Sequence, residues 1–204
     1  MSHDLVRYDL STNEPLQGVS IVDDTLDFHE GFEQLTDPLL KRYLKVRADT
    51  GYKPKVINEG WRAALEKLSP FQASLSKPEF LPTMCFSMIE ILHKRFPKHH
   101  LVVSDFHELP DTVEGIDGPV VQTRYQESMV ACSTYLVQPG WFDIFFPTNF
   151  ELLAKIYQEI CGRKAVIQTH REFLSQHGDV SATRTRSGEN PMLSYYENVK
   201  FLTS

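Results

Sequence analysis

The chain has 204 residues, 41% of them hydrophobic and 24% charged, which is enough for one domain with a hydrophobic core. Its net charge of -6 and its lack of a basic block argue against nucleic-acid binding, and no apolar run approaches the roughly 20 residues of a membrane span. The three cysteines lie far apart, so they predict neither a zinc site nor a disulfide framework, and they favour a reducing compartment.

The first part of the chain predicts a hairpin and a helix. Residues 5–23 combine two apolar, strand-like runs with turn residues between them. Asp37 and Pro38 form a favourable N-cap and first helical residue, and the apolar periodicity continues to about Ala48. Prolines interrupt residues 50–82, which we interpret as a peripheral excursion of the same domain.

A helix and a buried strand are expected next. Thr83 is placed to cap the helix and Pro97 to end it. The short apolar run Leu101–Ser104 follows at once, which is typical of a parallel strand buried on both faces. One side of the helix is expected to lie in the core rather than to form a cofactor site, and it comprises Met84, Met88, Ile91, Leu92 and Phe96.

The remaining elements are shorter. Residues 120–125 and 129–137 alternate as a hairpin would, and residues 141–146 are predicted to be a buried extended segment. Thr148 and Glu151 have the spacing of a capping box for a helix that ends at Gly162. After this helix we expect a strand at 165–168 and a helix with a second capping box at Thr169 and Glu172. A loop at 180–190 and a final strand at 199–202 are expected to follow.

Several of these segments, in this order, resemble the C-terminal half of the MidA-like methyltransferases, and the fungal-type members in particular. The resemblance runs from about residue 3 to the end of the chain. It is carried by Leu101–Phe106, by Pro139, Gly140, Asp143 and Phe150, by Gln168–Leu174 and by Lys200–Leu202.

The resemblance implies an α/β fold, in which residues 1–204 are a single domain. This domain would be the C-terminal portion of a Rossmann-like class I methyltransferase sheet with an added hairpin and helical excursion. It further implies the cofactor S-adenosyl-L-methionine, a protein substrate methylated on arginine, and a mitochondrial location, since the family is associated with assembly of respiratory complex I.

The glycine-rich cofactor loop of that family is missing from this sequence. The glycines are scattered, and no GxG or GxGxxG motif occurs. Only glycine lets the backbone approach such a ligand closely. We therefore expect the chain to be a fragment that does not bind S-adenosyl-L-methionine tightly by itself, and no transit peptide is recognisable at its start.

Two acids stand out as candidates for a substrate crevice, and no catalytic residue or metal site is identified. Ser104 and Asp105 end a predicted central strand, where the ligand crevice of an open α/β sheet lies. Asp105 could equally order the following loop as an N-cap or Asx-turn residue. Asp143 lies within an apolar run, so we expect it to face the crevice or to accept hydrogen bonds from a group such as Arg124.

Glu30 is the third candidate acid, in an acidic cluster with Asp27, His29 and Glu33. A carboxylate of this kind could accept the donor fork of a substrate arginine. A charged, solvated turn is the alternative interpretation of the cluster.

The sequence thus predicts a methyltransferase that acts on a protein substrate, without nucleic acid and without a membrane span. The alternative is a non-catalytic half-domain that serves as a protein-interaction module. An unpaired central strand would also favour self-association.

Overall fold

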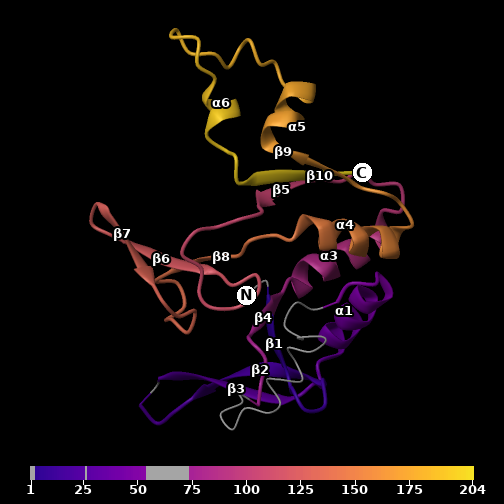
Figure 1. The fold of residues 1–204 in the computed structure, drawn as a ribbon, viewed down its shortest axis with the longest axis vertical. Helices are drawn as coiled ribbons and strands as arrows, with labels where there is room; N and C mark the ends of the chain where they lie inside the picture. Colours follow the sequence, from indigo (N-terminus) through magenta and orange to yellow (C-terminus); the bar gives the residue numbers. More distant parts are fainter. Residues whose placement is uncertain (1–2, 26, 54–73) are drawn as a thin grey trace, which may run out of the picture. The chain divides into compact units, whose positions relative to one another are not determined.

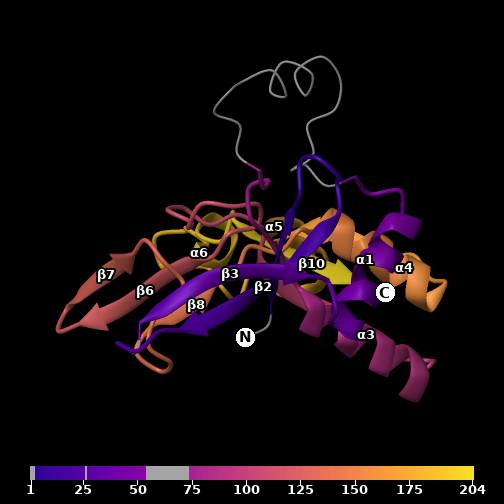
Figure 2. The same cartoon turned by 90° about the horizontal axis from the view of Figure 1, so that it is seen from below.

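The computed structural model describes residues 3–25, 27–53 and 74–204 (Figures 1 and 2). Most of the excursion predicted for residues 50–82 therefore lies outside the described residues. The chain forms two compact units, one of Met1–Met88 with Asp111–Phe145 and one of Ile89–Pro110 with Phe146–Ser204. The assignment of residues 1–204 to one domain stays a prediction.

The first unit contains an antiparallel four-stranded sheet in the order β3-β2-β1-β4. Its strands are β1 (Asp4–Tyr8), β2 (Pro15–Val22), β3 (Phe28–Gln34) and β4 (Glu79–Leu81). The predicted hairpin of residues 5–23 is confirmed as β1 and β2. Of the charged residues around Glu30, His29 and Glu33 belong with it to β3, which pairs along β2 from Leu16 to Val22, whereas Asp27 lies at the turn before that strand.

One face of this sheet lies toward helix α1 (Pro38–Asp49) and carries a buried ionic network. Val6 pairs with Glu79 across β1 and β4, so the two side chains point to the same face. Arg47 of α1 donates to Glu79 Oε1 at 2.9 Å and to the Tyr8 hydroxyl at 2.5 Å. The predicted cap of α1 is confirmed, since the Asp37 carboxylate accepts from the Leu40 amide at 2.8 Å.

The Tyr8 hydroxyl gives this network a pH dependence. Burial raises the pKa of Tyr8 to about 12, although the Arg47 charge opposes the rise. Between pH 10 and 12 the unfolded chain therefore loses a proton that the folded chain keeps, so the free energy of unfolding should fall as the pH rises, by up to about 1.4 kcal/mol per pH unit. Urea unfolding across this range measures the slope. Tyr8→Phe should make it shallower, whereas Tyr125→Phe, at an exposed residue, should not; equal slopes in all three proteins would contradict the assignment.

A second sheet of the first unit has the order β7-β6-β8 and is also antiparallel. It consists of β6 (Val120–Tyr125), β7 (Ser128–Cys132) and β8 (Asp143–Phe145). The predicted hairpin is confirmed, with a shorter second strand. The expectation that residues 141–146 are buried was wrong for part of the segment: Trp141 is 73% and Phe145 39% exposed, because the segment alternates between an exposed and a covered side.

The second unit contains a three-stranded sheet in the order β5-β10-β9. Its strands are β5 (Val102–Phe106), β9 (Val166–Thr169) and β10 (Val199–Thr203), and the central strand β10 is antiparallel to both neighbours. The expectation of a β5 buried on both faces and paired with a parallel neighbour was wrong for the described residues. β5 is an edge strand here, and Val102 is 60% exposed.

Helices α4 (Phe150–Cys161), α5 (His170–His177) and α6 (Pro191–Ser194) complete the second unit. The capping box predicted for α4 was displaced by one residue: Asn149 is the N-cap, and its side chain accepts from the Leu152 amide. Gly162 ends α4 with a φ of 66°, and the Thr169–Glu172 capping box opens α5; both confirm the predictions. Residues 180–190 contain no helix or strand, and α6 was not predicted.

Helix α3 (Thr83–Arg95) corrects the predicted core. Met84 and Ile91 were expected to be buried but are 54% and 55% exposed, and Met88 and Phe96 are exposed as well. Phe86 and Ile89 are buried instead, each 1% exposed. Apolar residues occur around most of this helix, so the periodicity alone could not show which side is covered.

Candidate functional site

The face of the first sheet opposite to α1 gathers the residues of a candidate site. Leu5 and Arg7 alternate with the buried Val6 and Tyr8 along β1, so they point to this face. The strand pairing adds Phe80 opposite Leu5, and Glu30 opposite Ser20. Gly18 lies on the same face, and a Cβ atom there would come within 2.8 Å of the Leu5 side chain. Glycine at position 18 therefore allows the Leu5 side chain to pack across β2.

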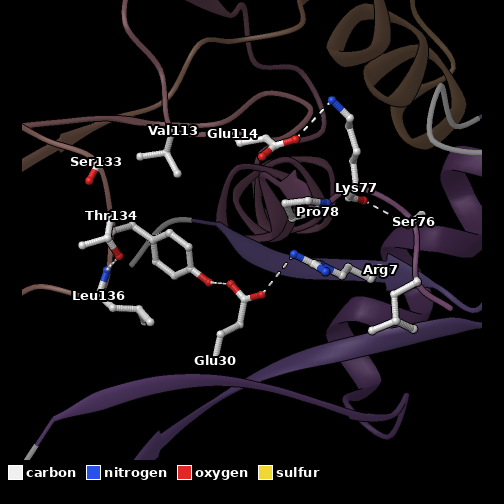
Figure 3. A pocket seen from close by; sticks show the side chains of 12 residues that line it. Arg7, Glu30, Ser76, Lys77, Pro78, Val113, Glu114, Ser133, Thr134 and Leu136 are labelled. Atoms are coloured by element: carbon white, nitrogen blue, oxygen red, sulfur yellow. Dashed lines mark hydrogen bonds and ion pairs between the residues drawn. The ribbon is translucent and has the colours of Figure 1, made fainter. Parts of the chain in front are cut away.

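Glu30 is the centre of this site. The Tyr135 hydroxyl donates to Glu30 Oε2, and an Arg7 guanidinium nitrogen lies 3.5 Å from Oε1 (Figure 3). The side chains of Glu30 and Arg7 are 23% and 29% exposed, so water reaches the pair only in part. Arg7 also lies over the Phe32 ring, 4.9 Å from its centroid, which holds the guanidinium to one side of the carboxylate.

Tyr135 reaches Glu30 from a loop between β7 and β8. Its ring meets the edge of Phe80 at a centroid distance of 5.3 Å, and this contact fixes where the hydroxyl points. Burial, together with the hydrogen bond to Glu30 and its charge, raises the pKa of the Tyr135 hydroxyl. Tyr135 therefore stays protonated at neutral pH and remains a donor to the carboxylate.

A polar cavity of about 420 Å³ lies on the Arg7 side of Glu30 (Figure 3). Two cations, Arg7 and Lys77, and two acids, Glu30 and Glu114, line it. Lys77 and Glu114 pair at 3.2 Å, and both are largely exposed. The remaining lining residues are small or neutral and comprise Leu75, Ser76, Pro78, Val113, Ser133, Thr134, Tyr135 and Leu136.

A second cavity of about 330 Å³ shares Glu30, Tyr135 and Leu136 with the first. Most of its lining is apolar. Asp4 and Glu30 are its acids, and neither lysine nor arginine occurs among the described residues that line it. The lining comprises His3, Asp4, Leu5, Gly18, Val19, Ser20, Phe28, Glu30, Phe80, Tyr135, Leu136, Val137 and Pro139.

The acidic cluster predicted around Glu30 is divided by the strand. His29 and Glu30 are neighbours in β3, so their side chains point to opposite faces. His29 contacts Asp23 at 2.7 Å instead, and Glu33 accepts from the Gln17 amide group at 2.8 Å. Of the four cluster residues, only Glu30 lines the cavities.

Asp105 and Ser104 belong to the second unit, where Asp105 organises the connection to α4. Asp105 Oδ1 accepts from the Phe106 amide at 2.8 Å, and Oδ2 accepts from the Thr148 hydroxyl at 2.6 Å. These bonds fit the loop-ordering alternative considered for this residue. Ser104 is exposed on β5, opposite Phe201 of β10. A role of either residue in a crevice stays a prediction.

Asp143 lies exposed on β8 and does not line either cavity around Glu30. The expected partner does not contact it, because Arg124 Nε donates to the Gln126 carbonyl oxygen. The alternation of the strand turns Asp143 outward with Trp141 and Phe145, so it needs no buried partner, and a role of Asp143 in a crevice stays a prediction.

Arg7 and Tyr135 were not named from the sequence. Arg7 could have been found by following the alternation of the first strand, which places it on the open face of the sheet. No local pattern marks Tyr135, because it lies in a loop 105 residues from Glu30.

The starts of α1, α4 and α5 do not form a cradle for S-adenosyl-L-methionine. One first-turn amide of each helix donates to a side chain of the chain itself, since Asp37, Asn149 and Thr169 cap α1, α4 and α5. None of these starts has the glycine-rich turn that the cofactor's close approach requires. In the described ranges, no three His, Cys, Asp or Glu side chains are placed to hold a metal ion, and none of the helices is long and apolar enough to cross a membrane.

Comparison with known proteins relates most of the chain to one family. A family described as "Putative S-adenosyl-L-methionine-dependent methyltransferase" matches residues 2–169. No curated protein matches the chain.

Two crystal structures from Burkholderia thailandensis share the fold. One is a COG1565 superfamily protein, with a TM-score of 0.53 and 14% sequence identity over 98% of this chain and 50% of that one. The other is a COG1565 superfamily member bound to S-adenosyl-homocysteine, with a TM-score of 0.51 and 12% identity over 98% of this chain and 49% of that one. This chain thus spans about half the length of the structures that it resembles.

Proposed function

Because the chain belongs to this family of S-adenosyl-L-methionine-dependent methyltransferases, we propose that it holds the substrate side of a protein arginine methyltransferase. It would form the C-terminal part of a MidA-like, fungal-type enzyme with a Rossmann-like sheet, and it would act in mitochondria. The order of the matching sequence segments supports the proposal that the chain is the C-terminal part of such an enzyme. The location rests on the family resemblance alone.

The proposed specificity for arginine rests on the environment of the Glu30 carboxylate. A partly buried carboxylate beside an apolar wall suits a guanidinium group, because charge-assisted hydrogen bonds strengthen where water is limited. Tyr135 holds one carboxylate oxygen in place, and Arg7 faces the other. Methyl transfer needs a positioned nitrogen more than it needs a strong base, so orientation by Glu30 would be the main contribution of these residues.

Replacement of Glu30 tests this proposal in the full-length protein. Glu30→Gln should lower methyl transfer from radiolabelled S-adenosyl-L-methionine to an arginine peptide by about 100-fold, because the amide loses the charge and one acceptor oxygen. Glu33→Gln is the matched control, since Glu33 is an exposed acid of the same strand, and it should stay within about twofold of the wild type. Unchanged transfer by Glu30→Gln would overturn the assignment.

A non-catalytic interaction module is the second candidate. The exposed apolar side of α3, with Met84, Met88 and Ile91, favours it, because contiguous exposed apolar surface marks contact sites. Absence of any methyl transfer by the full-length protein, with partner binding lost in Met88→Glu, would support the module over the enzyme.

A further inference from the structure

Two cavities meet at Glu30, and their charges differ. The polar cavity contains two cations, Arg7 and Lys77, balanced by Glu30 and Glu114. The described lining of the apolar cavity contains no lysine or arginine, and Glu30 is the acid whose side chain faces it, since the Asp4 carboxylate accepts from the Thr83 hydroxyl on the other face of β1. On the polar side a guanidinium group would lie beside Arg7 and Lys77, whose like charges disfavour it, whereas on the apolar side it would meet Glu30 without a neighbouring lysine or arginine.

We propose that the arginine side chain of the substrate enters the apolar cavity, an inference that rests on the arginine specificity proposed above. Its methylene stem lies against the apolar walls, and its guanidinium binds Glu30 from the side opposite to Arg7. Long cationic side chains commonly bury their stems in this way while the charged head finds a polar partner. The volume of about 330 Å³ is at the lower end of the range for small ligands, which suits one side chain better than a large molecule.

The Glu30 carboxylate can accept further hydrogen bonds from the substrate guanidinium. A carboxylate offers about four acceptor positions, and Tyr135 takes one of them. The Arg7 contact at 3.5 Å is an ion pair at the limit of hydrogen-bond distance, so Oε1 is only weakly used. Arg7 thus acts as a positioning residue that fixes the carboxylate from the polar side, held there by its contact with the Phe32 ring.

Particular residues form the wall of the apolar cavity. Leu5 packs across Gly18, and Phe80 and Val137 complete the wall near the Tyr135 ring. Bulk added at Val137 fills this cavity alone, since Val137 does not line the polar one. Bulk added at Ser133, in the same loop, enters only the polar cavity.

This pair of positions gives a direct test in the full-length protein without cofactor. The probe is a fluorescein-labelled peptide with a Gly-Arg-Gly centre, compared with a twin in which citrulline replaces arginine, and binding is followed by fluorescence anisotropy. We expect the wild type to prefer the arginine peptide, Val137→Phe to weaken its binding about tenfold, and Ser133→Phe to leave it unchanged. Thermal melting verifies that both variants are folded.

A charge variant tests the same assignment without added bulk. Lys77→Glu, at an exposed residue of the polar cavity, should change arginine binding by less than about twofold. Stronger binding by Lys77→Glu, or weaker binding by Ser133→Phe with Val137→Phe unaffected, would place the guanidinium in the polar cavity and overturn this inference alone. If the wild type binds the arginine and citrulline peptides equally, both this inference and the proposed arginine specificity are overturned. Methyltransferase activity would then still be tested separately, by methyl transfer to another residue type.

Discussion

Replacing Glu79 with alanine is expected to lower the free energy of unfolding by about 4 kcal/mol, because it leaves the Arg47 charge buried without its partner. Glu79 and Arg47 are 1% and 3% exposed, and their ion pair spans 2.9 Å. The pair links β4 to α1, and the second Arg47 nitrogen holds the Tyr8 hydroxyl of β1. Urea unfolding of the wild type and the variant measures the difference.

Two further variants separate the lost ion pair from a general effect of losing a charge. Asp49→Ala removes the exposed Lys45–Asp49 pair on α1 and should change stability by less than about 0.5 kcal/mol. The double replacement Arg47→Met with Glu79→Leu should recover most of the loss, since a buried pair exchanged for apolar side chains of similar volume is often neutral. A Glu79→Ala protein within about 1 kcal/mol of the wild type would show that water reaches Arg47.

The second large effect is expected at Gly118, in the connection between β5 and β6. An alanine Cβ atom there would lie 2.2 Å from the Val113 carbonyl oxygen, so the backbone must move. The Val113 amide donates to the Pro119 carbonyl at 2.7 Å, and Val113 lines the polar cavity. Gly118→Ala should therefore destabilise the protein by about 3 kcal/mol through overpacking and displace the cavity wall.

Gly188→Ala is the matched control for this steric effect. Gly188 has a φ of 88° with open space around it, so alanine meets only the backbone strain of the left-handed region. That strain should amount to about 1 kcal/mol. A melting temperature for Gly118→Ala no lower than that for Gly188→Ala would mean that the loop around Val113 shifts at little cost.

The candidate site was predictable only in part. Glu30 was named from the sequence, because a carboxylate of an acidic cluster could accept the donor fork of an arginine. Its geometry was not predicted, because neither interpretation of the cluster, as a recognition surface or as a solvated turn, places Glu30 in a strand. Once β3 is recognised, the two-residue period of a strand places Glu30 on the cavity face and His29 on the other.

Local chemistry in the sequence by itself determined where several elements begin and end. Asp37 before α1, Thr169 with Glu172 before α5, and Gly162 after α4 each satisfy groups within a few residues of themselves. Only the tertiary structure decided which side of α3 is covered, that β5 pairs with the antiparallel β10, and that Tyr135 reaches Glu30. The reason is that a cap or a period is a property of neighbouring residues. What a helix face, a strand edge or a side-chain hydroxyl contacts depends instead on segments that are distant in the sequence. A local sequence pattern does not specify which distant segments come together in the folded chain.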